Sequence, residues 1–150
     1  MLQALLEDRF KLKIHRETTD GPVYVLAVGK GISKLTPFRE GNCIQTPLTY
    51  PVPALAPDQR YCKVLISSRG AVDAEGSTLS EFSKLLNLIL DRPVIDKTGM
   101  QGRFDIHLEF SPDQATPKFM GPAPGVETAA SNPTGPTIFT AIQEQLGLKL

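Results

Sequence analysis

The chain has 150 residues with 16 basic and 16 acidic side chains, so its formal net charge is zero and no overall field attracts a polyanion. No basic run marks a nucleic-acid patch, which argues against nucleic acid as a partner. The hydrophobic content of 41% is normal for a globular protein, and no apolar run reaches the ~20 residues needed to span a bilayer. We therefore expect a single domain over residues 1–150, with no transmembrane segment in this chain.

The first forty residues predict a helix and then a strand pair. Apolar residues at helical spacing indicate an amphipathic helix over residues 1–10. The period then changes to two, because Phe10, Leu12 and Ile14 alternate with polar residues, as in a half-buried strand. The next run, residues 23–28, is apolar on both faces. We expect it to lie centrally in a sheet and to pair antiparallel with the preceding strand.

Residues 38–69 are rich in Pro, Thr, Gln and Gly and have no periodicity, so we expect a long loop. A loop of this length inside a compact domain needs an anchor. Cys43 and Cys62, the two cysteines of the chain, bracket most of it. They form either a disulfide, which is the interpretation that we favour, or two free thiols. A disulfide would stabilise the fold by roughly 3 kcal/mol through loop closure.

The clearest helix signal starts at Thr78, which forms a T-x-x-E capping box with Glu81. The apolar residues that follow recur at helical spacing, and Pro93 ends the pattern. A short strand at 94–95, a turn and an alternating strand at 104–110 complete this part.

Residues 113–133 predict a second loop rich in Pro, Gly, Ala and Thr, followed by a helix from about Thr137 that Gly147 ends. A short helix before an extended segment thus recurs three times along the chain. The pattern predicts an α+β fold in which short amphipathic helices pack on one face of a mostly antiparallel sheet, with long Pro-rich loops. The parts that we expect to be structured are residues 1–37, 70–112 and 134–150.

The segment between the last helix turn and the alternating strand gathers charged residues that are candidates for binding. These candidates are Arg92, Asp96, Lys97, Arg103, Asp105 and His107. Asp105 and Glu109 are candidates for paired catalytic carboxylates, but residues spaced by two on one strand also form an ordinary solvated face, and no concave apolar pocket is implied around them. We expect Asp96 to cap a turn at Thr98, with Gly99 or Gly102 at positive φ.

No catalytic residue, metal site or cofactor is predicted. The two histidines, His15 and His107, do not stand at the close spacing to the cysteines that zinc modules use. No G-x-S-x-G elbow and no complete phosphate-binding loop is present in the sequence.

The chain resembles a known family through three segments and one specific motif. The segments are LLEDRFKLKIHRETTDGPVYVLAVGKGISKL, LDRPVIDKTGMQGRFDIHLEF and PTIFTAIQEQLGLKL. The motif is R-P-V-x-D-K-T-G-x-x-G-x-[FY]-D, which is intact between Arg92 and Asp105. These features are similar to those of soil-associated acidobacterial proteins recognised as a domain of unknown function.

The resemblance implies an exported, secreted or periplasmic parent protein, because the family usually carries a signal peptide; two cysteines fit such a compartment. The family also has an additional N-terminal segment and a final strand pair that are absent from this sequence, so we expect a chain truncated at both ends. No activity is attached to the family. Some members are similar to, or fused with, membrane metalloprotease sensors of the antibiotic-sensing type.

Two functions remain as hypotheses. The first is a non-enzymatic extracytoplasmic module that binds an envelope protein or peptide, through an exposed strand edge. The second is an envelope-associated hydrolase or sensor domain with a cleft under the long loops, in which His15, His107 or Asp96 would meet in a pocket. The sequence leaves the oligomeric state open.

Overall fold

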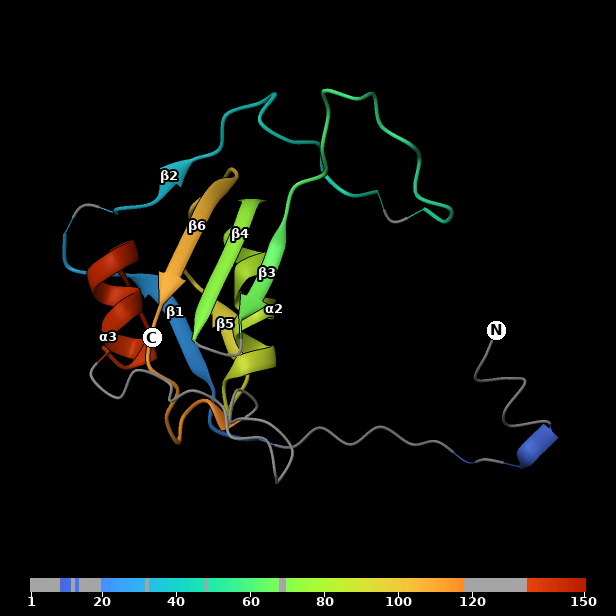
Figure 1. The fold of residues 1–150 in the computed structure, drawn as a ribbon. Helices are drawn as coiled ribbons and strands as arrows, with labels where there is room; N and C mark the ends of the chain where they lie inside the picture. Colours follow the sequence, from blue (N-terminus) through green and yellow to red (C-terminus); the bar gives the residue numbers. More distant parts are fainter. Residues whose placement is uncertain are drawn as a thin grey trace, which may run out of the picture.

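The structure is a computed structural model, and it describes residues 9–11, 13, 20–31, 33–47, 49–67, 70–117 and 135–150. These residues form a four-stranded sheet, a three-stranded sheet and two short helical segments (Figure 1). Four of the five strand pairings are antiparallel, which confirms the predicted α+β class. The expectation of one sheet was wrong, because the strands separate into two.

The four-stranded sheet is antiparallel and has the order β2-β6-β4-β3. Its strands are Thr36–Pro37 (β2), Val64–Ser67 (β3), Ala71–Ser77 (β4) and Phe104–Glu109 (β6). The alternation in β6 was predicted correctly, whereas β3 lies inside the predicted loop 38–69. The sequence of β4, AVDAEGS, is poor in the β-branched and aromatic residues that favour strands. Its strand state therefore depends on pairing with a neighbour on each side.

The three-stranded sheet has the order β5-β1-β7, with β1 at Tyr24–Val28, β5 at Val94–Asp96 and β7 at Leu148–Lys149. The predicted central position of β1 is confirmed. The predicted burial of both its faces was wrong, since Val25 and Val28 are exposed while Leu26 is fully buried. Only one side of this sheet faces the core.

The expected antiparallel partner of β1 is not formed by the described residues before it. Phe10 lies in a helical turn and Lys11 has a φ of 54°, a left-handed conformation that a strand does not adopt. The rest of the predicted helix and strand, residues 1–8, 12 and 14–19, lies outside the described residues. Instead, β1 pairs parallel with β5 and antiparallel with β7, each of which directly follows a helix. Two of the three predicted helix-then-strand units therefore flank β1.

Helix α2, Leu79–Ile89, begins with the predicted capping box. The Thr78 hydroxyl accepts a hydrogen bond from the Glu81 amide at 3.2 Å, and the Glu81 carboxylate accepts one from the Thr78 amide at 2.9 Å. The hydrogen bond that the Glu81 carboxylate accepts from the Thr78 amide is the main cause of the lowered pKa of Glu81. The apolar face packs inward through Phe82 and Leu86, and the helix ends before Pro93 as expected.

The last helix starts where it was predicted, at Thr137, which caps α3 (Ile138–Ala141), and it continues as a π-helical turn (η2) over Ile142–Leu146. Gly147 ends it with a φ of 69°. Gly29, at the end of β1, lies against this helix end, and its amide donates a hydrogen bond to the Gly147 carbonyl. A side chain at position 29 does not fit, because its Cβ would lie 2.8 Å from the same carbonyl oxygen. The helix end and the end of β1 therefore meet backbone to backbone.

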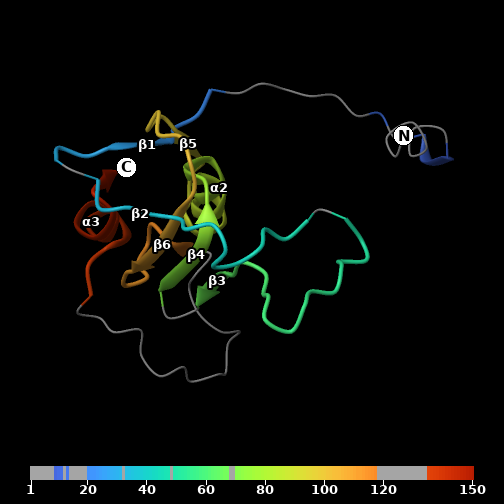
Figure 2. The ribbon, with the colours of Figure 1, turned by 90° about the horizontal axis from the view of Figure 1, so that it is seen from above.

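One core joins the two sheets and the two helices. Figures 1 and 2 show β1 and β5 behind the strands β4 and β6, with α2 beside β3 and β4 and α3 near β6 and β1. The fully buried side chains come from every layer, among them Leu26, Phe82, Leu108, Ile142 and Leu148. None of the helices formed by the described residues combines the length and apolar character needed to cross a membrane.

The long loop is closed by a disulfide between Cys43 and Cys62, with an S–S distance of 2.05 Å, as favoured from the sequence. A bridge between Ile44 and Tyr61 lies beside it. The loop is also attached to the sheet, since the Gln45 side chain donates to the Gly76 carbonyl at 3.0 Å. The disulfide and this hydrogen bond supply the anchor that a loop of this length requires.

Replacing Thr78 by Ala is expected to lower the free energy of unfolding by about 1 kcal/mol, because the amide of Glu81 loses its acceptor. Urea denaturation measures this change. Thr78→Ser, which keeps the hydroxyl, is the matched control and should remain close to wild type. Equal destabilisation by both substitutions would contradict a capping role.

Replacing Cys43 and Cys62 together by Ala is expected to cost roughly 3 kcal/mol of stability, because the closed loop has a sequence separation of 19 residues. The measurement is again urea denaturation, with and without reductant. Reductant should destabilise the wild-type protein by a similar amount and leave the double variant unchanged. A wild-type midpoint that does not respond to full reduction would rule out this stabilisation.

Candidate functional site

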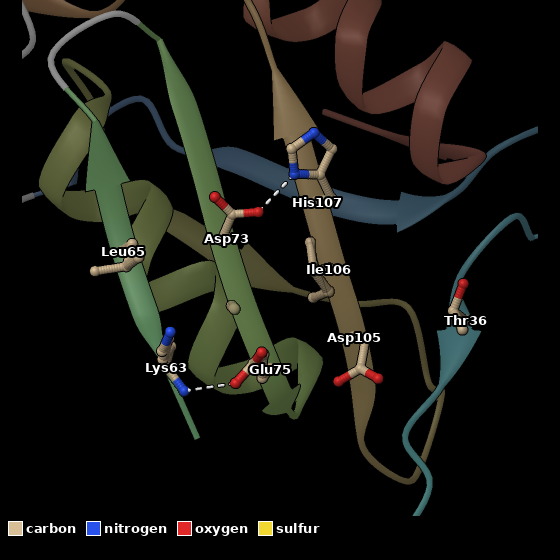
Figure 3. Close-up of a pocket in the computed structure, with 9 residues that line it drawn as sticks. Thr36, Lys63, Leu65, Asp73, Glu75, Asp105, Ile106 and His107 are labelled. Carbon is tan, nitrogen blue, oxygen red and sulfur yellow. Dashed lines mark hydrogen bonds and ion pairs between the residues drawn. The ribbon is translucent and has the colours of Figure 1, made fainter. Parts of the chain in front are cut away.

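The outer face of the four-stranded sheet, opposite the core, carries a shallow depression of about 420 Å³ (Figure 3). Side chains along β4 and β6 alternate in direction, so that one set enters the core and the other set points out and lines the depression. The charged residues that line it are Lys63, Asp73, Glu75, Asp105 and His107. The sequence implied no concave apolar pocket here, and it did not predict the strands β2, β3 and β4, which line the depression together with β6.

His107 lies between two carboxylates. Its Nδ1 is 2.5 Å from an oxygen of Asp73, the residue opposite it on β4, and its Nε2 is 3.3 Å from Glu109. An imidazole that faces an acceptor with each nitrogen satisfies both only when it is doubly protonated. The hydrogen bond with Asp73 is the main cause of the raised pKa of His107.

Glu75 is engaged with the disulfide loop. Its carboxylate pairs with Arg60 and accepts a hydrogen bond from the Lys63 amide at 2.9 Å. The hydrogen bond from Arg60 is the largest cause of the lowered pKa of Glu75. This carboxylate therefore holds the strand entering β3 against β4.

Arg103 and Asp105 both contact Gly76, where the pairing of β4 with β6 shifts register. The Arg103 guanidinium donates to the Gly76 carbonyl at 2.6 Å, and the Asp105 carboxylate accepts from the Gly76 amide at 2.9 Å. Arg103 also lies 3.4 Å from Glu81 at the start of α2. These two predicted binding residues fix a β-bulge.

The other three predicted residues lie around β5, in the three-stranded sheet. The Arg92 guanidinium is 3.3 Å from Asp91, and its Cζ lies 5.6 Å from the centre of the Tyr24 ring. Asp96 accepts from both the amide and the hydroxyl of Thr98, at 2.9 and 2.7 Å, so it forms the predicted turn cap. The Lys97 amide donates to the carbonyl of Leu26 in β1.

Both glycines of this turn region have positive φ, 68° at Gly99 and 105° at Gly102. The prediction from the sequence was that one of the two would have it.

The six predicted residues therefore divide between two sheets. Asp96 and His107 do not share a site, since each has partners on its own sheet, and His15 lies outside the described residues. Within the part of the chain that the structure describes, no three His, Cys, Asp or Glu side chains are gathered to hold a metal ion.

Sequence reasoning missed the edge strand β3, whose three apolar side chains are all exposed. The accessible fractions are 48% for Val64, 56% for Leu65 and 38% for Ile66. The run Val-Leu-Ile between polar residues was a strand signal, but the surrounding Pro-rich composition hid it. β3 pairs with β4, and among the described strands none lies beyond it.

The fold and this face define an α+β protein with a disulfide-anchored loop and an antiparallel sheet whose edge strand β3 has no described strand beyond it. The chain belongs to the family described as "Protein of unknown function (DUF3738)", whose model matches residues 1–150. No curated protein and no solved structure gives a significant match to it.

The raised pKa of His107 predicts a pH dependence of stability. A pKa above the unfolded value of 6.5 means that the contribution is complete below pH 6.5 and is lost as the pH rises through the folded-state pKa. Because the pairs are exposed, the contribution should not exceed about 1 kcal/mol.

Urea denaturation of wild type and His107→Gln between about pH 5 and pH 9 tests this dependence. The stability difference should be largest at the acidic end and vanish at the alkaline end. Asp73→Asn, which removes the main partner, should lower the pKa of His107 in an NMR titration. A pH-independent difference, or an unchanged pKa in Asp73→Asn, would contradict this account.

Proposed function

We propose that this chain is an extracytoplasmic protein-binding module that takes up an extended segment of a partner along the edge strand β3. The observation that carries the proposal is the exposure of Val64, Leu65 and Ile66, three consecutive apolar residues on a sheet edge that no described strand covers. Proteins commonly protect such edges with charges, prolines or bulges, since the edge is a template for another strand.

The backbone of β3 supports this mode of binding. The amide of Glu75 donates to the carbonyl of Lys63, so these two residues form a hydrogen-bonded pair. Hydrogen-bonded and non-hydrogen-bonded pairs alternate in an antiparallel ladder. Val64 and Ile66 therefore belong to non-hydrogen-bonded pairs with Ala74 and Val72, and their amide and carbonyl groups point away from the sheet. These are the groups that an added strand uses.

The disulfide supports the proposed compartment. Structural disulfides persist in oxidising environments and are rare in the cytosol. Cys43 and Cys62 close a loop that ends directly before β3. A secreted or periplasmic location is also what the resemblance to the soil-associated acidobacterial family implies.

The charged depression supports binding rather than catalysis. Each carboxylate that lines it has a partner within the protein: Asp73 contacts His107, Glu75 contacts Arg60, and Asp105 accepts from the Gly76 amide. A general base needs a substrate proton within reach, and these groups already stabilise the sheet. Arg103, Asp105 and His107 are proposed to hold the face that presents β3, while Arg92, Asp96 and Lys97 hold the second sheet.

Photo-crosslinking in cells that export the full protein tests this function. A photoreactive phenylalanine derivative replaces Ile66, and the matched control carries it at Leu88, an exposed apolar position on α2. Adducts are expected from position 66 and not from position 88. Adding Val64→Pro should abolish them, because proline removes an outward amide and leaves the ladder with β4 intact.

Urea denaturation of the Val64→Pro variant shows whether it is still folded. Adducts that persist in a folded Val64→Pro variant, or that form equally from both positions, would refute strand addition at this edge.

A further inference from the structure

We infer that the partner of β3 is the β3 strand of a second copy of this chain. The two strands would pair antiparallel about a two-fold axis at Leu65, so that two four-stranded sheets become one continuous sheet. This inference rests on the proposed function and names the partner of the same edge.

The outward backbone groups select the register. An antiparallel partner must place its own outward-pointing residues opposite Val64 and Ile66. In the register centred on Leu65, Val64 of one copy faces Ile66 of the other, and Ile66 faces Val64. Each of these pairs exchanges both of its hydrogen bonds. A two-fold axis at Val64 would instead place Ile66 opposite Cys62, which lies before the strand and whose amide already donates to the Ile44 carbonyl. An axis at Ile66 would place Val64 opposite residue 68, which lies outside the described residues.

The side chains fit the same register. Val64 and Ile66 lie on the face of β3 that continues Ala74 and Val72 of β4, both buried. The symmetric arrangement sets each β-branched side chain opposite another, which is a favourable cross-strand pair. It therefore covers apolar surface that is 38–48% accessible in the single chain.

The charge beside β3 is also compatible with pairing to a second copy. The one charged residue next to the pairing span is Lys63, directly before β3. In the register centred on Leu65 it lies opposite Ser67 of the other copy, so the two Lys63 side chains do not face each other. An edge strand that pairs with its own copy must keep like charges apart in this way, because like charges directly opposite each other are unfavourable.

Leu65 lies on the outer face, where it lines the depression beside Asp73. In Figure 3 its side chain extends past β3 on the side away from β4. On the two-fold axis it would meet Leu65 of the other copy in a non-hydrogen-bonded pair, the pair type with the closer side chains. The depressions of the two copies would then adjoin across this leucine pair.

A four-residue edge buries little area, so the dimer is expected to be weak and reversible. Sedimentation velocity of the oxidised full chain, from about 10 μM to about 1 mM, should show a concentration-dependent dimer. Ile66→Pro should abolish it, and Ile66→Thr, which keeps the amide, should retain dimerisation.

The register is tested with two charge variants, Leu65→Glu and Leu65→Lys. Each alone should raise the dimer dissociation constant by about tenfold or more, because like charges replace the leucine pair. An equimolar mixture should recover the dimer as a heterodimer. Leu65 is 56% accessible, so neither change disturbs the core, and thermal unfolding of each variant confirms that it is folded.

The outcomes separate this inference from the proposed function. Recovery in the mixture together with loss in Ile66→Pro supports the symmetric pairing. A monomer at every concentration, with crosslinks from position 66 that still depend on Val64, overturns the second copy but keeps strand addition. A dimer whose dissociation constant is unchanged by Ile66→Pro and by the charge variants forms through another face, and this result also overturns the inference.

Discussion

Arg103 donates a hydrogen bond to the carbonyl of Gly76, and the arrangement of the molecule depends on this contact. Gly76 has a φ of 58°, a left-handed conformation that favours glycine, and a Cβ there would lie 2.5 Å from the end of the Gln45 side chain and 3.2 Å from the Phe38 ring. Its amide binds Asp105 of β6, and its carbonyl also accepts from Gln45 of the disulfide loop. One backbone position thus connects β4, β6 and the loop that leads to β3.

This junction explains why the charged residues on the outer face serve the fold. The bulge at Gly76 interrupts the pairing of β4 with β6, which resumes at Ser77 and Phe104 just before α2 begins, and Arg103 contacts Glu81 in the first turn of α2. The carboxylates of Asp105 and Glu75 stabilise the bulge and the strand entering β3. With these groups occupied by contacts within the protein, the proposed binding relies on the edge strand β3.

The sequence predicted part of the candidate site for a sound reason. A period of two placed Asp105 and His107 on one face of a strand, and β6 has that alternation. Asp73, which contacts His107, and Glu75, which lines the same depression, were not found, because AVDAEGS has few residues that favour strands and becomes a strand between two neighbours. Arg92, Asp96 and Lys97 stood close to these residues in the sequence. The glycine-containing turn after β5 sends the chain to a different sheet, so sequence proximity did not become spatial proximity.

The sequence by itself determined the local elements: the capped helix after Thr78, the turn at Asp96, the glycine end at Gly147 and the alternation of β6. Each depends on contacts between residues a few positions apart, so a short window contains the information. Tertiary structure decided the division into two sheets, the partners of β1, the strand state of β4 and the exposed edge of β3. These depend on hydrogen bonds between segments far apart in the chain, and pairing of that kind is specified by the packed core as a whole rather than by any single segment.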